Sequence, residues 1–321
     1  MAGFNTDTLL KGNSRDLCPK KILEFAEKDE DIVFIVSDWS TELGAYAEFR
    51  KKYPKRFIDV GIAEMNGVGV ATGLALAGKK PFFMGFGPFI SLRATDQIHS
   101  DAAYNNLPIK LIGTHGGMTS GGGPTHYALA DFGIIRSIPN MTLIAPSDAN
   151  QCVKALEASL AWDQPVYIRI ARGEEPLVYD NTDYKYEIGK SIVVKEGRDL
   201  TFIGTGIGVF LSLKAAEILS QKGIDAQVID MHTIKPLDAE AILKAAEETR
   251  CMITVEDHNI MAGLGGAVAE VIADSGIGCK FHRIGVPDDF PPFGGAEDLY
   301  AYYGMNPEAV AEKAANLVKN K

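Results

Sequence analysis

The first half of the chain alternates short apolar runs with stretches of helical spacing. The apolar runs include "DIVFIV", "KPFFMGF", "PIKLIG" and "PVYIRI", and none of them alternates apolar and polar positions. Stretches of helical spacing lie before or between these runs, over residues 15–29, 64–78, 92–104 and 149–162. Short strands rich in Val and Ile, separated by helices, are typical of a parallel sheet covered on both faces. We therefore predict an α/β domain with a parallel sheet over residues 1–175.

The same pattern restarts after a polar, aromatic and aperiodic segment. Residues 176–190 are predicted to be a linker. Strand-like runs "DLTFIGTG", "DAQVIDM", "CMITVED" and "CKFHRIG" then alternate with helical stretches, which predicts a second, smaller α/β domain over residues 191–321. The chain is predicted to finish with a helix in which Asn306 is the N-cap and Pro307 the first helical residue.

Composition narrows the class of protein. Of the 321 residues, 46% are hydrophobic and 23% charged, which is the ordinary globular range and argues against disorder. The net charge of −10 disfavours nucleic-acid binding through a basic face. No apolar run is long enough to cross a membrane, and the first residues lack the order of a signal peptide. The four cysteines form no CxxC pair, so we expect free thiols in a reducing compartment, the cytoplasm.

Polar and aromatic side chains follow the predicted strands of the first domain. In parallel α/β sheets, such residues gather at the carboxyl edge, where ligands bind. Carboxylates, aromatic rings, histidines and arginines would meet there, as in a site for an anionic small molecule. The residues concerned are Asp38, Ser40, Glu42, Glu64, Phe86, Phe89, His115, Arg169 and Arg172.

Two interpretations of Glu64 are open. The residue stands where the pattern predicts burial, just before a helix rich in glycine and alanine, and a buried carboxylate needs a partner. It could pair with a nearby arginine or cap the helix. Alternatively, a desolvated carboxylate could share a proton with a ring nitrogen of a bound heterocycle. Phe86 and Phe89 are core residues by default, but one of them could stack on such a ring.

The segment "GTHGGMTSGGGPTHYALAD" contains six glycines and is bracketed by His115 and His126. Glycine permits unusual backbone angles and a close approach to a ligand. Two histidines flanking such a loop favour a binding site, and no cysteine or third histidine suggests zinc. Arg15 and Arg172 are surface ion pairs by default; if they reach the cleft, their planar guanidinium groups suit phosphate or sulfonate oxygens.

Several common motifs are missing from the chain. There is no GxxxxGK[ST] motif, no complete dinucleotide fingerprint and no acidic cluster resembling a magnesium site. We therefore expect no metal ligands in this chain, and the candidate residues look like half of an active site.

Five ordered segments resemble the C-terminal half of transketolase, and the resemblance runs over nearly the whole chain, from about Arg15 to the terminal helix. The resemblance implies a thiamine-diphosphate enzyme with a pyrimidine-binding domain followed by a transketolase C-terminal domain. In that family a GDG…N motif in the N-terminal half binds the diphosphate and a divalent cation such as Mg²⁺, and "GDG" does not occur here. The resemblance thus implies the second subunit of a split transketolase, in a two-plus-two heterotetramer with a partner that carries this motif. The segments are "RFIDVGIAEMNGVGVATGLALAG", "PFFMGFGPFISLRATDQI", "GTHGGMTSGGGPTH", "PNMTLIAPSDANQ" and "ITVEDHNIMAGLGGAVAE".

The resemblance also implies roles for individual residues. Glu64 would hydrogen-bond the aminopyrimidine ring of thiamine diphosphate and activate the cofactor by sharing a proton with it. Phe86 would stack on that ring, with Phe89 beside it and Asp38 approaching the cofactor. The substrate would be held by two histidines at its hydroxyls and by two arginines at its terminal phosphate. These are His115, His126, Arg15 and Arg172.

Two positions depart from the family pattern. Gly122 stands where an aspartate commonly contacts the acceptor's hydroxyl, and Glu42 where a phosphate-binding serine is common. A missing acid relaxes hydroxyl selection, and a carboxylate repels phosphate. Both departures argue against the standard pentose phosphates and leave a branched, sulfonated or otherwise unusual ketose open as the substrate.

Three functions remain open. The leading one is transfer of a two-carbon ketol unit from a ketose to an aldose. The second is decarboxylation, as in 1-deoxyxylulose-5-phosphate synthase or the beta subunit of a 2-oxo acid dehydrogenase. The third is a non-catalytic partner. Glu256 and His258 of the second domain suggest no clear chemistry, so we expect that domain to serve assembly.

Overall fold

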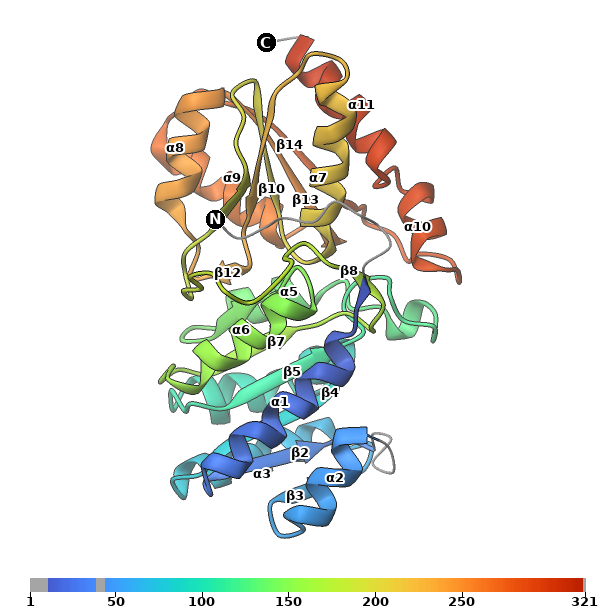
Figure 1. The fold of residues 1–321 in the computed structure, drawn as a ribbon. Coiled ribbons are helices and arrows are strands. Elements are labelled where there is room, and N and C mark those ends of the chain that lie inside the picture. Colours follow the sequence, from blue (N-terminus) through green and yellow to red (C-terminus); the bar gives the residue numbers. More distant parts are fainter. Residues whose placement is uncertain (1–10, 39–43, 320–321) are drawn as a thin grey trace.

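The computed structural model describes residues 11–38 and 44–319, and within them it shows two α/β domains stacked end to end (Figure 1). Each domain is built on its own sheet. The first domain holds the candidate site residues, and the second lies above it in the view of Figure 1.

The first domain contains a seven-stranded sheet with the order β12-β6-β7-β5-β4-β2-β3. All neighbouring strands are parallel except β12, which pairs antiparallel with β6 and comes from the second half of the chain. The predicted parallel sheet is therefore confirmed, and the extra edge strand was not foreseen. The strands are β2 (Ile32–Val36), β3 (Phe57–Asp59), β4 (Lys80–Phe86), β5 (Lys110–Thr114), β6 (Thr142–Ile144), β7 (Val166–Arg169) and β12 (Thr233–Lys235).

Helices cover both faces of this sheet, because alternate residues of each strand are buried on opposite sides. Phe34 packs with the helices of one face and Ile35 with those of the other. The first face carries α1 (Ser14–Lys28), α2 (Gly44–Lys52) and α6 (Ala149–Leu160). The second face carries α3 (Glu64–Leu76), η1 (Phe89–Arg93), α4 (Thr95–Gln97), η2 (Ile98–Ala103) and α5 (Asp131–Ser137).

Residues 92–104 are helical, as the sequence predicts, but they do not form one regular α-helix. Two π-helical segments, η1 and η2, flank a single turn of α-helix, α4. Side-chain hydroxyl groups compete here with backbone N–H groups for the helical carbonyl oxygens. Ser91 Oγ donates to the Gly87 carbonyl at 2.8 Å, and Thr95 Oγ1 donates to the Leu92 carbonyl at 3.1 Å. Widened turns of this kind are frequent at functional sites.

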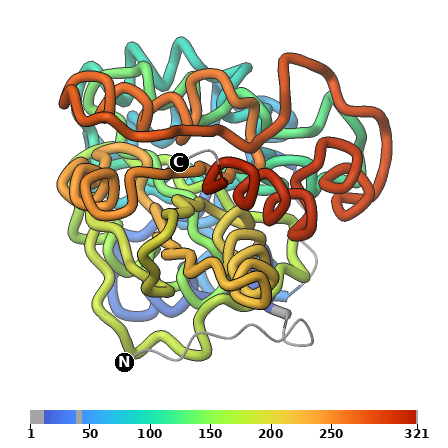
Figure 2. The backbone as a smooth tube through the Cα atoms, turned by 90° about the horizontal axis from the view of Figure 1, so that it is seen from above, coloured from blue at the N-terminus to red at the C-terminus, as the bar shows by residue number. Residues whose placement is uncertain are grey.

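The second domain contains a five-stranded sheet with the order β14-β13-β10-β11-β9, parallel except for the edge strand β9. Helices α7 and α11 run side by side over one face (Figure 2), and α8 and α9 cover the other. The Asn306 side chain accepts a hydrogen bond from the Ala309 N–H, which confirms the predicted cap of α11. The elements are β9 (Ile192–Lys195), β10 (Leu200–Gly204), α7 (Ile207–Ser220), β11 (Ala226–Asp230), α8 (Ala239–Thr249), β13 (Cys251–Asn259), α9 (Leu264–Ser275), β14 (Lys280–Val286), α10 (Ala296–Tyr302) and α11 (Pro307–Lys319).

The segment between the domains is packed into the protein. Strand β8 (Glu175–Pro176) pairs antiparallel with β1 (Lys11–Gly12), and the side chains of Val178 and Tyr179 are fully buried. One hydrophobic cluster also continues from the first domain to Ile203 of the second. The boundaries 1–175, 176–190 and 191–321 remain our proposal for the division of the chain.

Two further properties concern the described residues. None of their helices combines the length and hydropathy needed to span a bilayer. Their cysteines are not joined in disulfide bonds.

Candidate active site

Glu64 is the first residue of α3, and its side chain is buried at the carboxyl edge of the sheet, with only 2% of the residue exposed. Ser37, which follows β2, donates a hydrogen bond from Oγ to Glu64 Oε1 at 3.0 Å. Arg93 donates from Nη1 to the other oxygen, Oε2, at 3.1 Å. The carboxylate therefore has an arginine partner, as in the first of its two interpretations, and it is buried, which the second interpretation also assumes.

Arg93 is a residue of this site that the sequence interpretation missed. It is the last residue of η1, and its guanidinium carbon lies 4.0 Å from the centroid of the Phe89 ring. Arg93 thus donates a hydrogen bond to Glu64 and also makes a cation–π contact with Phe89, an aromatic residue of the candidate site. Its spacing of four residues from Phe89, on one helical segment, was the available signal.

Four rings form one cluster at the ends of β4 and β5. The Phe86 centroid lies 4.4 Å from that of His115 and 5.5 Å from that of Phe89. His126, from the 3₁₀ turn η3 (Pro124–His126), stands edge-on to both phenylalanines, with centroids 5.7 and 5.0 Å away. The structure therefore brings together the two aromatic and the two histidine residues that the sequence singled out.

His115 is held in an unusual backbone conformation, with φ at +59°, and only 6% of it is exposed. Its Nδ1 lies 2.9 Å from Thr114 Oγ1. Burial lowers the pKa of His115 to about 4, and the positive charges of Arg172 and Arg15 add to the effect, followed by that of His126. At neutral pH this imidazole is uncharged.

Arg15 and Arg172 line the same cleft, which has a volume of about 510 Å³. Arg15 lies in the first turn of α1, and Arg172 follows β7. The second domain closes the cleft with residues of α7 and α10, among them Tyr300. A β-carbon at Gly121 would lie 2.8 Å from Nη1 of Arg172, so the cleft borders the glycine loop that ends at His126.

Asp38 and Gly122 are two further candidate positions within the described residues. Asp38 is exposed after β2, with φ at +49°, and its N–H donates to Asp59 Oδ1 at 3.0 Å. Gly122 is pressed against the second histidine, because a β-carbon at this position would lie 2.6 Å from Cγ of His126. Glu42 and Ser40 lie outside the described residues.

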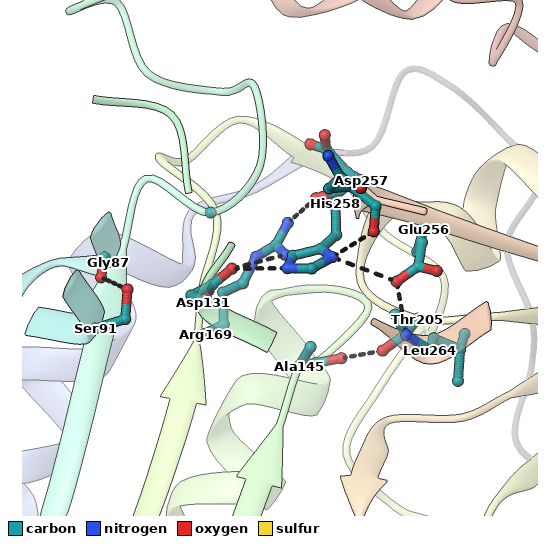
Figure 3. A network of polar contacts seen from close by, with 12 residues as sticks. Gly87, Ser91, Asp131, Ala145, Arg169, Thr205, Glu256, Asp257, His258 and Leu264 are labelled. Atoms are coloured by element: carbon teal, nitrogen blue, oxygen red, sulfur yellow. Dashed lines mark hydrogen bonds and ion pairs between the residues drawn. The ribbon is translucent and has the colours of Figure 1, made fainter. Parts of the chain in front are cut away.

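A buried polar network joins the two domains behind the site (Figure 3). Asp131 Oδ1 lies 3.6 Å from Nη1 of Arg169 in the first domain and 3.8 Å from Nε2 of His258 in the second. Burial lowers the pKa of His258 to about 3, with help from Arg169. Burial also raises the pKa of Glu256 to about 7, and its carboxylate accepts the N–H groups of Leu264 and Gly265 at the start of α9.

The described part of the chain contains no cluster suited to a metal ion. There, no three His, Cys, Asp or Glu side chains come close enough together to hold one.

Comparison with known proteins identifies the family. Residues 13–176 match the pyrimidine-binding domain of transketolase, and residues 189–310 match the transketolase C-terminal domain. This chain belongs to the transketolase family.

Relatives of similar length match almost end to end. A subunit of the apulose-4-phosphate transketolase of Phocaeicola vulgatus is 38% identical over 93% of this chain and 95% of its own. A 6-deoxy-6-sulfo-D-fructose transketolase subunit from a Clostridium species is also 38% identical, over 96% of this chain and 95% of its own. The solved structure described as a split gene transketolase, inactive beta4 tetramer, superposes with a TM-score of 0.87 at 34% identity, covering 96% of this chain and 98% of that chain.

A longer relative matches over part of its length. The 1-deoxy-D-xylulose-5-phosphate synthase of Halothermothrix orenii is 37% identical over 94% of this chain, which corresponds to 47% of that enzyme.

Proposed function

We propose that this chain is the pyrimidine-binding subunit of a two-chain transketolase that moves a two-carbon ketol unit from an anionic ketose to an aldose. The observation that carries the proposal is the placement of Glu64. This buried carboxylate is linked through Arg93 to Phe89, which packs against His126, and the glycine loop that ends at His126 lies against Arg172 in a cleft with two arginines. The end-to-end similarity to transketolase subunits of the same length supports the same assignment.

The residues at the strand ends suit the aminopyrimidine ring of thiamine diphosphate. Glu64 presents a buried carboxylate, and Phe86 and Phe89 are half-buried aromatic rings close to it in the fold. At Gly61, just before α3, no atom lies within 4 Å of where a β-carbon would stand, so the surface is open there. When bound, thiamine diphosphate supplies the nucleophilic carbon that breaks and forms the carbon–carbon bond.

We assign the cofactor contacts to four residues of this chain. Glu64 shares a proton with a pyrimidine nitrogen, and burial strengthens that hydrogen bond. Phe86 offers its face to the ring, Phe89 lies beside it, and Asp38 approaches the cofactor from the end of β2.

The substrate contacts follow from the charges in the cleft. His115 is neutral at pH 7, because its pKa is about 4, so it hydrogen-bonds sugar hydroxyls without adding a charge. His126 contacts the substrate from the opposite end of the glycine loop. Arg15 and Arg172 hold the anionic end of the sugar through charge-assisted hydrogen bonds.

The sugar is expected to be an unusual ketose with a phosphate or sulfonate group. The two transketolase subunits of similar length are named for apulose-4-phosphate and for 6-deoxy-6-sulfo-D-fructose, so both kinds of anionic group occur among the relatives. Gly122 brings no acid to read an acceptor hydroxyl, and its contact with His126 leaves no room for a side chain.

The diphosphate and Mg²⁺ are assigned to a separate N-terminal subunit with a GDG…N motif. Two copies of each chain would form a heterotetramer. The relatives named as subunits support a second chain, and the similar beta4 tetramer is described as inactive.

Reconstitution tests the proposed function. The chain is mixed with its partner, thiamine diphosphate, Mg²⁺, an aldose acceptor and a panel of phosphorylated and sulfonated ketoses, and release of the shortened aldose is measured. Glu64→Ala should reduce the rate by about 100-fold or more, because it removes the proton-sharing group. Gel filtration of the mixture checks that the variant still binds its partner. An E64A complex with undiminished activity would rule out the role of Glu64, and full activity of the chain alone would rule out the two-chain enzyme.

A decarboxylating enzyme is the second candidate, and the similarity to 1-deoxy-D-xylulose-5-phosphate synthase favours it. Release of carbon dioxide from pyruvate by the reconstituted pair, without transfer between sugars, would establish this alternative. A non-catalytic partner would show neither reaction. It would also lack the circular-dichroism band that thiamine diphosphate gives when its pyrimidine ring is activated.

A further inference from the structure

The second domain reaches into the glycine loop that carries His115 and His126. Asp257 belongs to β13 of that domain and is almost fully buried. The N–H of Met118, three residues after His115, donates to both carboxylate oxygens of Asp257 at 3.1 Å. One side chain of the second domain thus holds the backbone of the loop.

The loop backbone is seated directly on side chains beneath it. Gly117 has φ at +62°, and a β-carbon at this residue would lie 1.9 Å from Asp257 Oδ2. At Gly116 a β-carbon would lie 2.4 Å from Nε of Arg169. Only glycine permits this approach, so the two glycines and the two side chains fit one another.

Asp257 is itself fixed on two sides. Tyr300 of α10 donates from its hydroxyl to Oδ2 at 2.7 Å, and Arg169 donates to the Asp257 backbone carbonyl. Burial raises the pKa of Asp257, whereas the charge of Arg169 and the hydrogen bonds from Tyr300 and Met118 favour the carboxylate. The acid is therefore buried and held by partners on both sides.

The part of the loop that Asp257 holds is also hydrogen-bonded to the segment that follows His126. The N–H of Ala128, two residues after His126, donates to the Gly117 carbonyl at 3.0 Å. His115 has a positive φ, which a residue with a side chain keeps only when its surroundings hold it there. Both histidines are therefore tied to the backbone that Asp257 supports.

We propose that Asp257 and Tyr300 are positioning residues of the active site: they hold the glycine loop so that His115 and His126 face the substrate. What the histidines contact rests on the proposed function, whereas the support of the loop does not. The second domain then contributes to catalysis in addition to any part in assembly.

Hydrogen exchange on the full-length chain tests the support directly. Asp257→Ala should speed exchange of the amides in residues 116–126 by about 5- to 100-fold, the effect of losing one buried hydrogen-bond acceptor. Asp257→Asn keeps one acceptor oxygen and should restore part of the protection. Tyr300→Phe removes a single hydroxyl group, so it carries the test if the D257A chain fails to fold.

Glu256→Gln is the matched control. Glu256 is the neighbouring buried acid of β13, but its carboxylate accepts N–H groups of α9, inside the second domain. E256Q should therefore loosen α9 and leave the glycine loop protected. Unchanged loop exchange in D257A, or equal loosening of the loop by E256Q, would overturn the positioning role.

Kinetics of the reconstituted complex separate positioning from general destabilisation. D257A should lower kcat and raise KM for the ketose by about tenfold or more, with D257N intermediate. A general loss of stability would instead reduce the amount of active complex and leave KM unchanged. Glu64→Ala should reduce transfer by about 100-fold or more without changing loop exchange. If the wild-type complex transfers no ketol unit, the proposed function fails, while the exchange experiment still decides the role of Asp257.

Discussion

Glu64 accepts hydrogen bonds from two side chains that are distant in sequence, Ser37 and Arg93. The partners occupy both of its carboxylate oxygens, and a buried carboxylate without such donors would be costly. Arg93 is also partly exposed and lies over Phe89, so it contacts both the buried carboxylate and an aromatic ring of the candidate site. At the scale of single residues, Glu64 and Arg93 therefore form one unit.

The protonation of His115 gives a prediction at the same scale. Replacing Arg172 with Met should raise the pKa of His115 from about 4, because a nearby positive charge is removed. The pKa should remain below the ordinary value of 6.5, since burial is the larger cause. Titration of the imidazole NMR signals measures the shift. Arg198→Met, at an exposed arginine that pairs with Asp225, is the control and should leave the pKa unchanged.

The lowered pKa also sets the sign of a stability effect. Below pH 6.5 the unfolded chain protonates this histidine while the folded chain does not. The free energy of unfolding should therefore fall between pH 6.5 and pH 4 on account of His115, and the loss should be smaller in His115→Gln. An H115Q chain with the same acid sensitivity as the wild type would contradict the assigned pKa.

The glycine loop is the element on which the site depends most. It begins at the end of β5, ends at η3, and is fastened at Met118 and Ala128 by hydrogen bonds. Its glycines bring the backbone against Arg169, Asp257 and His126, where a side chain would collide. The loop is thus shaped by its neighbours in both domains.

Gly122→Ala tests that close packing. The new methyl group would lie 2.6 Å from Cγ of His126, so the imidazole must move. We expect kcat/KM of the reconstituted complex to fall by about 10- to 100-fold, as for other small displacements of a group that contacts substrate. Gly278→Ala, where no atom lies within 4 Å of the added carbon, is the control and should retain full activity. An active G122A enzyme would show that His126 can shift without loss.

On the scale of the whole molecule, the two domains share one interior. Strand β12, which comes from the second half of the chain, is an edge strand of the sheet of the first domain. A single hydrophobic cluster includes Ile135 of one domain and Ile203 of the other. The polar network of Figure 3 crosses the same boundary. We therefore expect the domains to unfold together.

Ile234→Ala in β12 tests this coupling. Ile234 is 1% exposed, and removing its buried side chain should lower the free energy of unfolding by about 2–5 kcal/mol. Tryptophan fluorescence, which comes from Trp39 and Trp162, both within residues 1–175 of the sequence, should change at the same urea concentration as far-UV circular dichroism. Val193→Ala at the 40%-exposed edge strand should cost about 0.5 kcal/mol or less. Two separate transitions would show that the domains are independent.

The sequence by itself determined the two α/β domains, the parallel strands and the residues that follow them. Hydrophobic periodicity is local, and parallel strands necessarily collect their carboxyl ends at one edge. It also supplied Glu64, Phe86, Phe89, His115 and His126, because each lies at or near such an end.

Only the tertiary structure decided which side chains support those residues. Arg93 reaches Glu64 from 29 positions away, and Asp257 reaches Met118 from 139 positions away. Neither pair shares a helix turn or a strand register, so no local pattern records it. The antiparallel strand β12 was missed for the same reason, since its partner β6 lies in the other half of the chain. Contacts between distant segments depend on how completed elements pack, and packing is settled only when the whole chain has folded.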